Sequence, residues 1–240
     1  MKTVKITFKP VRTLSVPFGH FSMLQGLAYS LMAVDEQLAL EIHDRNFTDR
    51  KAFKFFCFSD LEGRYSIRSK QLVFEDVISW EIRSADDRII NAVVQSLMNG
   101  GIMEVYRQPC TILSYEVSEK HFFADEMTVQ MKTPIVVYNT LPSGYVRYYN
   151  PFEREFYDML IRNIKNKWEM FFDEPFAERV SIECDCPSDD DKCVTHYKKS
   201  IINAWYGTYH IKAPSHLLEF IYYTGIGSKN SAGFGTFTEM

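Results

Sequence analysis

The chain has 240 residues, of which 46% are hydrophobic and 24% are charged, as in ordinary soluble globular proteins. This composition excludes a disordered chain, a collagen-like repeat and a small disulfide-stabilised protein. The formal net charge of −4 argues against a domain that wraps nucleic acid, because such domains usually carry an excess of lysine and arginine. The length admits one large domain or two domains of about 120 residues each.

The first residues do not predict export or membrane insertion. Met1–Phe8 alternates charged and apolar residues and lacks the apolar run of a signal peptide. No stretch reaches the ~20 apolar residues that cross a bilayer. The five cysteines are an odd number, which does not suit a framework of disulfides. We therefore expect a cytoplasmic protein with reduced thiols and no membrane contact.

The first half of the sequence alternates strand and helix patterns. Apolar residues recur every second position in strands and at i, i+3 and i+4 in helices. Asp86 is the expected N-cap of the second long helix, and Gly100 and Gly101 are expected to end it in left-handed conformations. The expected elements are a strand over Val4–Phe8, a loop between Pro10 and Pro17, helices over 20–32 and Glu36–His43, strands over Phe53–Phe58, Tyr65–Ile67, Leu72–Phe74 and Val77–Ile82, a helix over 87–98, and strands over Ile102–Tyr106 and Thr111–Val117.

The second half repeats this order of elements but not the sequence. Asn150 and Pro151 are expected to cap and open its first helix. The expected elements are strands over Thr128–Met131, Ile135–Tyr138 and Tyr145–Tyr148, a helix over 151–168, strands over Val180–Ile182 and Ile201–Tyr206, a strand over Tyr209–Lys212 that pairs behind a turn at Gly207, a helix opened by Pro214-Ser215, and a strand over Phe234–Thr238. Each half then has the βαββαβ order of a ferredoxin-like domain. We predict the α+β class with two tandem ferredoxin-like (RRM-like) domains, residues 1–120 and 121–240; one larger α+β domain is the alternative.

The last 16 residues are rich in glycine. Glycine reaches positive φ without strain and lets another backbone come close. A glycine-rich loop can also present several backbone N–H groups to one anion. It is not a Walker A loop, because no G-K-[ST] precedes a helix. We predict that the loop binds a single-stranded nucleic acid backbone, through Gly225, Gly227, Ser228, Lys229, Asn230, Ser231, Gly233 and Gly235.

Several short motifs resemble one protein family. The tail G-I-G-S-K-N-S-A-G-F-G is the most specific, and the others are Pro17-Phe-Gly-His20, Leu24-Gln-Gly-Leu-Ala-Tyr29, Leu38-Ala-Leu-Glu-Ile-His43, Lys54-Phe-Phe-Cys-Phe-Ser59 and Thr133-Pro-Ile-Val-Val137. With these motifs the chain resembles the RAMP superfamily of CRISPR proteins, and within it the endoribonuclease that cuts CRISPR repeat RNA to release guide RNAs. The resemblance covers nearly the whole chain, although residues 60–120 match only in pattern.

The resemblance implies a metal-independent reaction, without a cofactor, in which the 2′-hydroxyl of the RNA attacks the adjacent phosphate. It assigns the general acid–base role to His43, a place near the 2′-hydroxyl to Tyr29, and the phosphate contact to Lys54. Lys51 is the alternative lysine. Histidine suits this role because its unperturbed pKa of ~6.5 lies near neutrality. The expected partner is CRISPR repeat RNA, while effector-complex subunits and a second copy of the chain are left open. The competing hypothesis is a non-catalytic RAMP subunit that only holds guide RNA.

Two further patterns are weaker. The spacing of Cys184, Cys186, Cys193 and His196 allows tetrahedral zinc, but its first interval is tight and we do not predict a metal.

A basic face for RNA is a second pattern, formed by Arg162, Lys165, Lys167, Lys198 and Lys199. Four lysines against two glutamates follow from residue 196 onward. The acidic average therefore hides a positive region around the glycine-rich tail.

Overall fold

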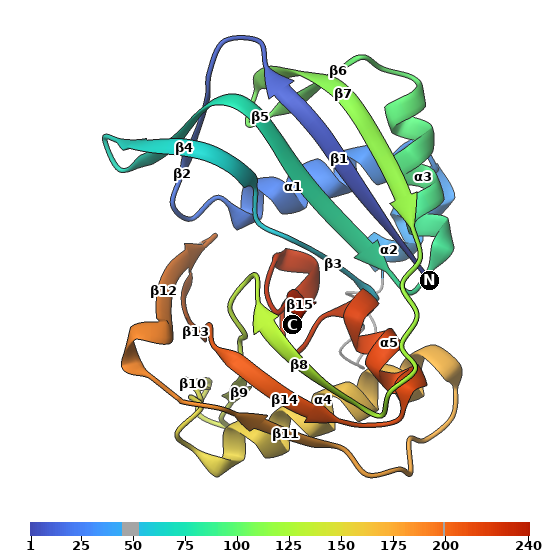
Figure 1. Ribbon diagram of the computed structural model, residues 1–240, viewed down its shortest axis with the longest axis vertical. Coiled ribbons are helices and arrows are strands. Elements are labelled where there is room, and N and C mark those ends of the chain that lie inside the picture. Colours follow the sequence, from blue (N-terminus) through green and yellow to red (C-terminus); the bar gives the residue numbers. More distant parts are fainter. Residues whose placement is uncertain (45–52, 199) are drawn as a thin grey trace.

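The computed structural model describes residues 1–44, 53–198 and 200–240, with the side chains of residues 43 and 44 also outside the description. Two large antiparallel sheets follow one another along the chain (Figure 1). The red C-terminal segment, with α5, lies between the two sheets in this view. This is the α+β, tandem ferredoxin-like arrangement that the sequence predicts.

The first sheet is built by residues 2–118. Its strands are β1 (Lys2–Pro10), β2 (Leu14–Pro17), β3 (Phe56–Phe58), β4 (Glu62–Arg68), β5 (Gln71–Ser84), β6 (Ile102–Val105) and β7 (Gln108–Ser118). The strand order is β2-β5-β1-β7-β6, and both β3 and β4 also pair with β5. The helices are α1 (Phe21–Met32), α2 (Glu36–Asp44) and α3 (Asp87–Met98).

The second sheet is smaller and has the order β11-β14-β8-β15. Its strands are β8 (Glu126–Met131), β11 (Ser181–Cys184), β14 (Thr208–Lys212) and β15 (Phe237–Glu239), and its long helices are α4 (Arg154–Phe172) and α5 (Ser215–Thr224). Two hairpins form separate two-stranded sheets, β9 (Tyr138–Thr140) with β10 (Val146–Tyr148), and β12 (Lys192–Tyr197) with β13 (Ser200–Trp205). The short helices η1 (Asp189–Asp191) and η2 (Asn230–Ala232) complete the chain. We propose the domain division at residues 120 and 121, between β7 and β8.

The C-terminal segment packs into the core of the first half. Ala232 and Phe234 belong to the same buried apolar cluster as strand β1 and helix α1. The ring of Phe234 meets that of Phe21 edge-on, with centroids 5.1 Å apart. Burial of such aromatic surface stabilises the contact by about 2 kcal/mol or more per ring. The tail therefore fixes the two halves to each other.

Some local predictions need correction in the first half. The loop between Pro10 and Pro17 contains strand β2, which pairs with one end of β5. The two strands expected over Leu72–Phe74 and Val77–Ile82 form the single strand β5. Asp86 caps α3 as predicted, by accepting the N–H of Arg88. The glycines after α3 do not adopt positive φ, and the C-cap of the helix is right-handed.

Two predictions in the second half also change. Helix α4 begins at Arg154 with Glu153 as N-cap, because Asn150 uses its side chain in a separate turn, where its Oδ1 accepts the N–H of Phe152 at 3.0 Å. Strand β13 pairs with β12, which the sequence did not predict, and β14 pairs instead with β8 and β11. The turn at Gly207 thus separates strands of two different sheets.

Candidate active site

Helix α1 and the start of β3 bring two of the predicted catalytic residues together. Tyr29 lies in the last turns of α1, and Lys54 lies just before β3. The Lys54 Nζ donates a hydrogen bond to the Tyr29 Oη at 2.8 Å and lies 4.9 Å from the centroid of its ring. Both side chains are half-buried, so they reach solvent without being freely mobile.

The surroundings change the acidity of both groups. Burial raises the pKa of Tyr29 to about 12, with a further contribution from Tyr197, while a hydrogen bond from Ser231 opposes the change. Burial also lowers the pKa of Lys54, and the nearby positive charge of Lys198 lowers it further. The phenol is therefore a hydrogen-bond donor at neutral pH rather than a phenolate.

The third predicted catalytic residue, His43, lies in the last turn of α2. Its side chain lies outside the described residues, as does the whole of the alternative Lys51. The helix itself is firmly placed, because Leu38 and Ile42 are buried and Glu41 accepts a hydrogen bond from Arg88 of α3 at 2.9 Å. The contacts of Leu38, Glu41 and Ile42 therefore fix the backbone of His43.

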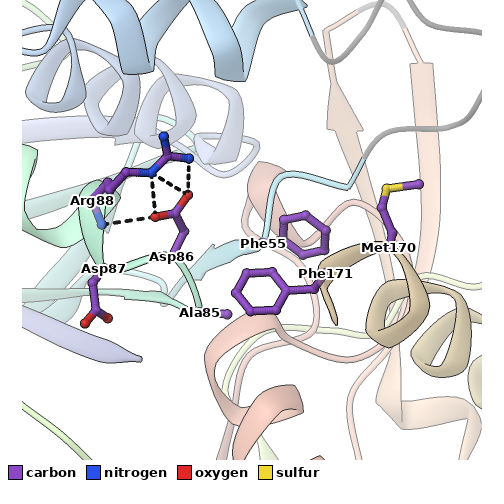
Figure 2. Close-up of a pocket in the computed structure, with 7 residues that line it drawn as sticks. All are labelled: Phe55, Ala85, Asp86, Asp87, Arg88, Met170 and Phe171. Carbon is purple, nitrogen blue, oxygen red and sulfur yellow. Dashed lines mark hydrogen bonds and ion pairs between the residues drawn. The ribbon is translucent and has the colours of Figure 1, made fainter. Parts of the chain in front are cut away.

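A surface pocket of about 350 Å³ lies beside Arg88, at the junction of α3 with the end of α4. Figure 2 shows its charged wall, where Arg88 forms hydrogen bonds with Asp86, and its aromatic wall, where Phe55 and Phe171 meet with ring centroids 4.9 Å apart. The guanidinium is already occupied by Asp86 and Glu41. We therefore regard this pocket as a packing seam between the two halves.

The four glycines of the tail are packed in the interior of the protein. All four are buried and adopt positive φ. A Cβ on Gly235 would lie 1.9 Å from the carbonyl oxygen of Ile226, and one on Gly233 would lie 2.6 Å from the ring of Phe58. The backbone N–H groups of Gly225, Gly233 and Gly235 donate to carbonyl groups within the protein. These groups are not available to a phosphate, which corrects the predicted cradle.

Asn230 and a buried lysine hold this segment from inside. The Asn230 Nδ2 donates to the carbonyl groups of Ile226 and Phe234, at 2.9 and 3.0 Å, and its Oδ1 accepts from the Lys167 Nζ at 3.2 Å. Lys167 also donates to the carbonyl of Gly225 and is only 1% exposed. Burial lowers the pKa of this lysine to about 7. Lys167 is therefore not part of an exposed basic face, and that prediction was wrong for it.

The partly exposed residues of the tail are Ser228, Lys229 and Ser231. Among the predicted RNA contacts, only these present side chains toward solvent. Ser231 also faces helix α1, since its carbonyl accepts a hydrogen bond from the Gln25 Nε2 at 2.8 Å. Contact of the tail with RNA stays a prediction, and these three residues are the ones whose side chains reach solvent.

Gln25 and Tyr197 are site residues that the sequence interpretation missed. The hydroxyl of Tyr197 donates to the Gln25 Oε1, so the β12–β13 hairpin is linked to α1. Gln25 precedes Tyr29 by one helical turn, and a glutamine among the apolar residues of that helix was a usable signal. Tyr197 ends a strand with alternating half-buried residues, a weaker signal.

The zinc pattern gains no support within the described residues. No group of three or more histidine, cysteine, aspartate or glutamate side chains among them is placed to hold a metal ion. Cys184 lies on β11, whereas Cys193 and His196 lie on β12, and these strands belong to different sheets. Cys184 is therefore on a different sheet from Cys193 and His196.

A comparison with known protein families identifies the family of this chain. The family model described as CRISPR associated protein Cas6, C-terminal, matches residues 117–239, which is just over half of the chain. The chain belongs to the Cas6 family. It is therefore a CRISPR-associated protein. A search of curated proteins finds no match.

Solved structures share the fold of this Cas6 protein over their whole length. A structure described as CRISPR associated protein Cas6 is 21% identical, with a TM-score of 0.79 and coverage of 100% of this chain and 99% of that one. A Cas6-related protein from Pyrococcus furiosus is 15% identical, with a TM-score of 0.83 and coverage of 99% and 98%. A RAMP protein that binds different RNA substrates is also 15% identical, with a TM-score of 0.83 and full coverage of both chains. Among the described residues, no helix is long and apolar enough to span a membrane.

Proposed function

We propose that this Cas6 family protein is a metal-independent endoribonuclease that cuts CRISPR precursor RNA within its repeats. The observation that carries the proposal is the hydrogen bond between Lys54 and Tyr29, 2.8 Å long, at the surface where α1, β3 and the glycine-rich segment meet. A cation held against a phenol at a half-buried surface suits a reaction in which negative charge builds up on a phosphate. Family membership supplies the RNA substrate class.

RNA carries its own nucleophile, so the protein has to move protons and stabilise charge. The 2′-hydroxyl attacks the adjacent phosphorus and loses its proton to a base. The bond from phosphorus to the 5′-oxygen breaks, and that oxygen takes a proton from an acid. The products are a 2′,3′-cyclic phosphate and a 5′-hydroxyl. Each proton transfer by a positioned side chain contributes ~10²–10⁴-fold to the rate, and we assign this role to His43.

Tyr29 and Lys54 act on the other charges of the reaction. The phenol of Tyr29, protonated because its pKa is raised to about 12, donates a hydrogen bond toward the 2′-oxygen. The ammonium of Lys54 faces the phosphate and stabilises the charge of the pentavalent state. Its partial burial strengthens that attraction, because less water screens it. The exposed parts of Ser228, Lys229 and Ser231 hold the RNA beside these groups.

Incubation with the CRISPR repeat transcript in EDTA tests the proposal. We expect wild-type protein to cut within the repeat, and His43→Ala to bind the same RNA without cutting it. Lys5→Met, an exposed change on β1, is the control and should cut like wild type. Loss of cutting in EDTA would refute metal independence. Wild-type protein that binds the repeat but never cuts it would instead indicate a guide-RNA-binding subunit.

A further inference from the structure

Three lysines from distant parts of the chain converge beside Tyr29. Lys54 precedes β3, Lys198 lies at the tip of the β12–β13 hairpin, and Lys229 lies in the glycine-rich segment. Besides burial, the charge of Lys198 lowers the pKa of Lys54 and that of Lys229, so it lies close to both. The Lys198 Nζ is 5.6 Å from the ring centroid of Tyr197, and the Lys229 Nζ is 5.8 Å from the same centroid.

These ammonium groups have no countercharge within the described residues. No carboxylate of residues 1–42, 53–198 or 200–240 forms an ion pair with any of the three. Other lysines of the protein do pair, such as Lys132 with Glu62 and Lys120 with Glu239, each at 2.7 Å. Bringing like charges together costs free energy unless an anion joins them. Such a cluster is typical of a site for an anionic ligand.

The three positions are fixed by contacts between their elements. Tyr197 of the hairpin donates to Gln25 of α1, which in turn donates to the carbonyl of Ser231 in η2. The hairpin also lies against the start of α1, where a Cβ on Gly19 would come within 2.9 Å of the carbonyl of His196. The lysines therefore stand on a connected framework rather than on independent loops.

Aromatic rings lie beside the ammonium groups of Lys198 and Lys229. Lys229 lies between Tyr138 and Tyr197, with its Nζ 5.1 Å from the centroid of Tyr138. Attraction to the ring faces restrains an ammonium group and leaves its N–H donors free for a ligand. Lys54, in contrast, donates one of its three N–H groups to Tyr29.

We propose that Lys198 and Lys229 form a second phosphate site, which binds the phosphodiester next to the one that Lys54 contacts. This inference rests on the proposed function, because Lys54 defines the scissile phosphate. A single-stranded backbone is flexible enough to place consecutive phosphates against separate cations. The second contact fixes the direction in which the strand crosses Tyr29. It therefore determines which linkage of the repeat reaches the catalytic groups.

The test combines protein variants with RNA in which single linkages are uncharged. The probe is the repeat RNA with a 2′-deoxy nucleotide at the cut, carrying a methylphosphonate at one linkage at a time. The variant is K198Q with K229Q, and the control is K192Q, at the other end of the same hairpin. We expect the double variant to bind at least about tenfold more weakly than wild type, the effect of losing a charge-assisted contact. K192Q should bind like wild type.

The decisive comparison is between linkages. A methylphosphonate at the linkage adjoining the cut should weaken wild-type binding about tenfold and leave the double variant unchanged, because both changes remove the same contact. If a methylphosphonate at every linkage weakens RNA binding equally for wild type and double variant, the second site is overturned. Cutting by the wild type would still support the proposed function in that case. Wild-type protein that neither binds nor cuts the unmodified repeat would overturn the proposed function, and the second site with it.

Discussion

Replacing the buried Lys167 with methionine should change how stability depends on pH. The side chain is 1% exposed, and burial lowers its pKa from 10.5 to about 7. Methionine has a similar length and no charge, so Lys167→Met removes the cost of burying the amine. It also removes the donor to the Gly225 carbonyl and to the Asn230 Oδ1.

These two effects have similar size at pH 7. At 1.36 kcal/mol per pKa unit, keeping this amine neutral at pH 7 costs about 4 kcal/mol relative to the unfolded chain. Each of the two buried acceptors left without a donor costs about 1–3 kcal/mol, or about 4 kcal/mol together. We therefore expect the variant and wild type to differ by no more than about 2 kcal/mol in free energy of unfolding at pH 7.

The difference in free energy of unfolding between wild type and variant changes as the pH rises. Between pH 7 and 10.5 the unfolded chain binds a proton at this lysine and the folded chain does not, so wild-type stability increases with pH over this window. The increase approaches about 1.4 kcal/mol per pH unit. By pH 10 the wild type should therefore have gained about 3–4 kcal/mol over the variant. Urea denaturation of both proteins from pH 7 to 10 measures this difference, with Lys165→Met as the control for losing a lysine from the same helix. A difference that stays constant over this range would refute the reasoning.

Three further predictions concern other parts of the site and its support. Burial lowers the pKa of His20, but Asp60 and the backbone of residues 17 and 18 more than offset this and raise it above 6.5. The His20–Asp60 pair should therefore stabilise the protein most below pH 6.5, and progressively less as the pH rises through the raised pKa. Asp60→Asn should abolish this trend in melting temperature. Gly235→Ala should lower the free energy of unfolding by about 3 kcal/mol or more, from positive φ and a clash with Ile226, whereas Gly26→Ala, with nothing within 4 Å, should not be destabilising; equal melting temperatures would contradict this. Lys54→Met should slow single-turnover cleavage about 10²–10³-fold, and an unchanged rate would remove this lysine from the mechanism.

Elements that bury one face were predictable from the sequence. Strand β1 alternates apolar and polar residues because only one of its faces meets the core. Helix α1 repeats apolar residues at helical spacing for the same reason. Strand β12 was missed because its inward residues are only half-buried and follow an acidic turn, so its alternation is shallow. The separate β12–β13 hairpin buries little surface, so its sequence has only a weak apolar alternation.

The site was predictable in its residue types but not in its contacts. The resemblance implied roles for both Tyr29 and Lys54, and the structure joins them by a hydrogen bond. The number of tail glycines was visible in the sequence, but their fit against Ile226 and Phe58 depends on the tertiary structure. Lys167 follows Ile164 by three residues and so lies on the buried face of α4, a spacing that could have predicted its burial.

The central claim is that the RNA supplies the nucleophile at a site formed by Tyr29, His43 and Lys54. The most direct test uses repeat RNA with a single 2′-deoxy nucleotide on the 5′ side of the scissile phosphate. The account predicts that this RNA binds like the unmodified repeat and stays uncut, while the unmodified repeat yields a 2′,3′-cyclic phosphate and a 5′-hydroxyl. Cleavage of the deoxy-substituted RNA at the same linkage and at full rate would contradict it.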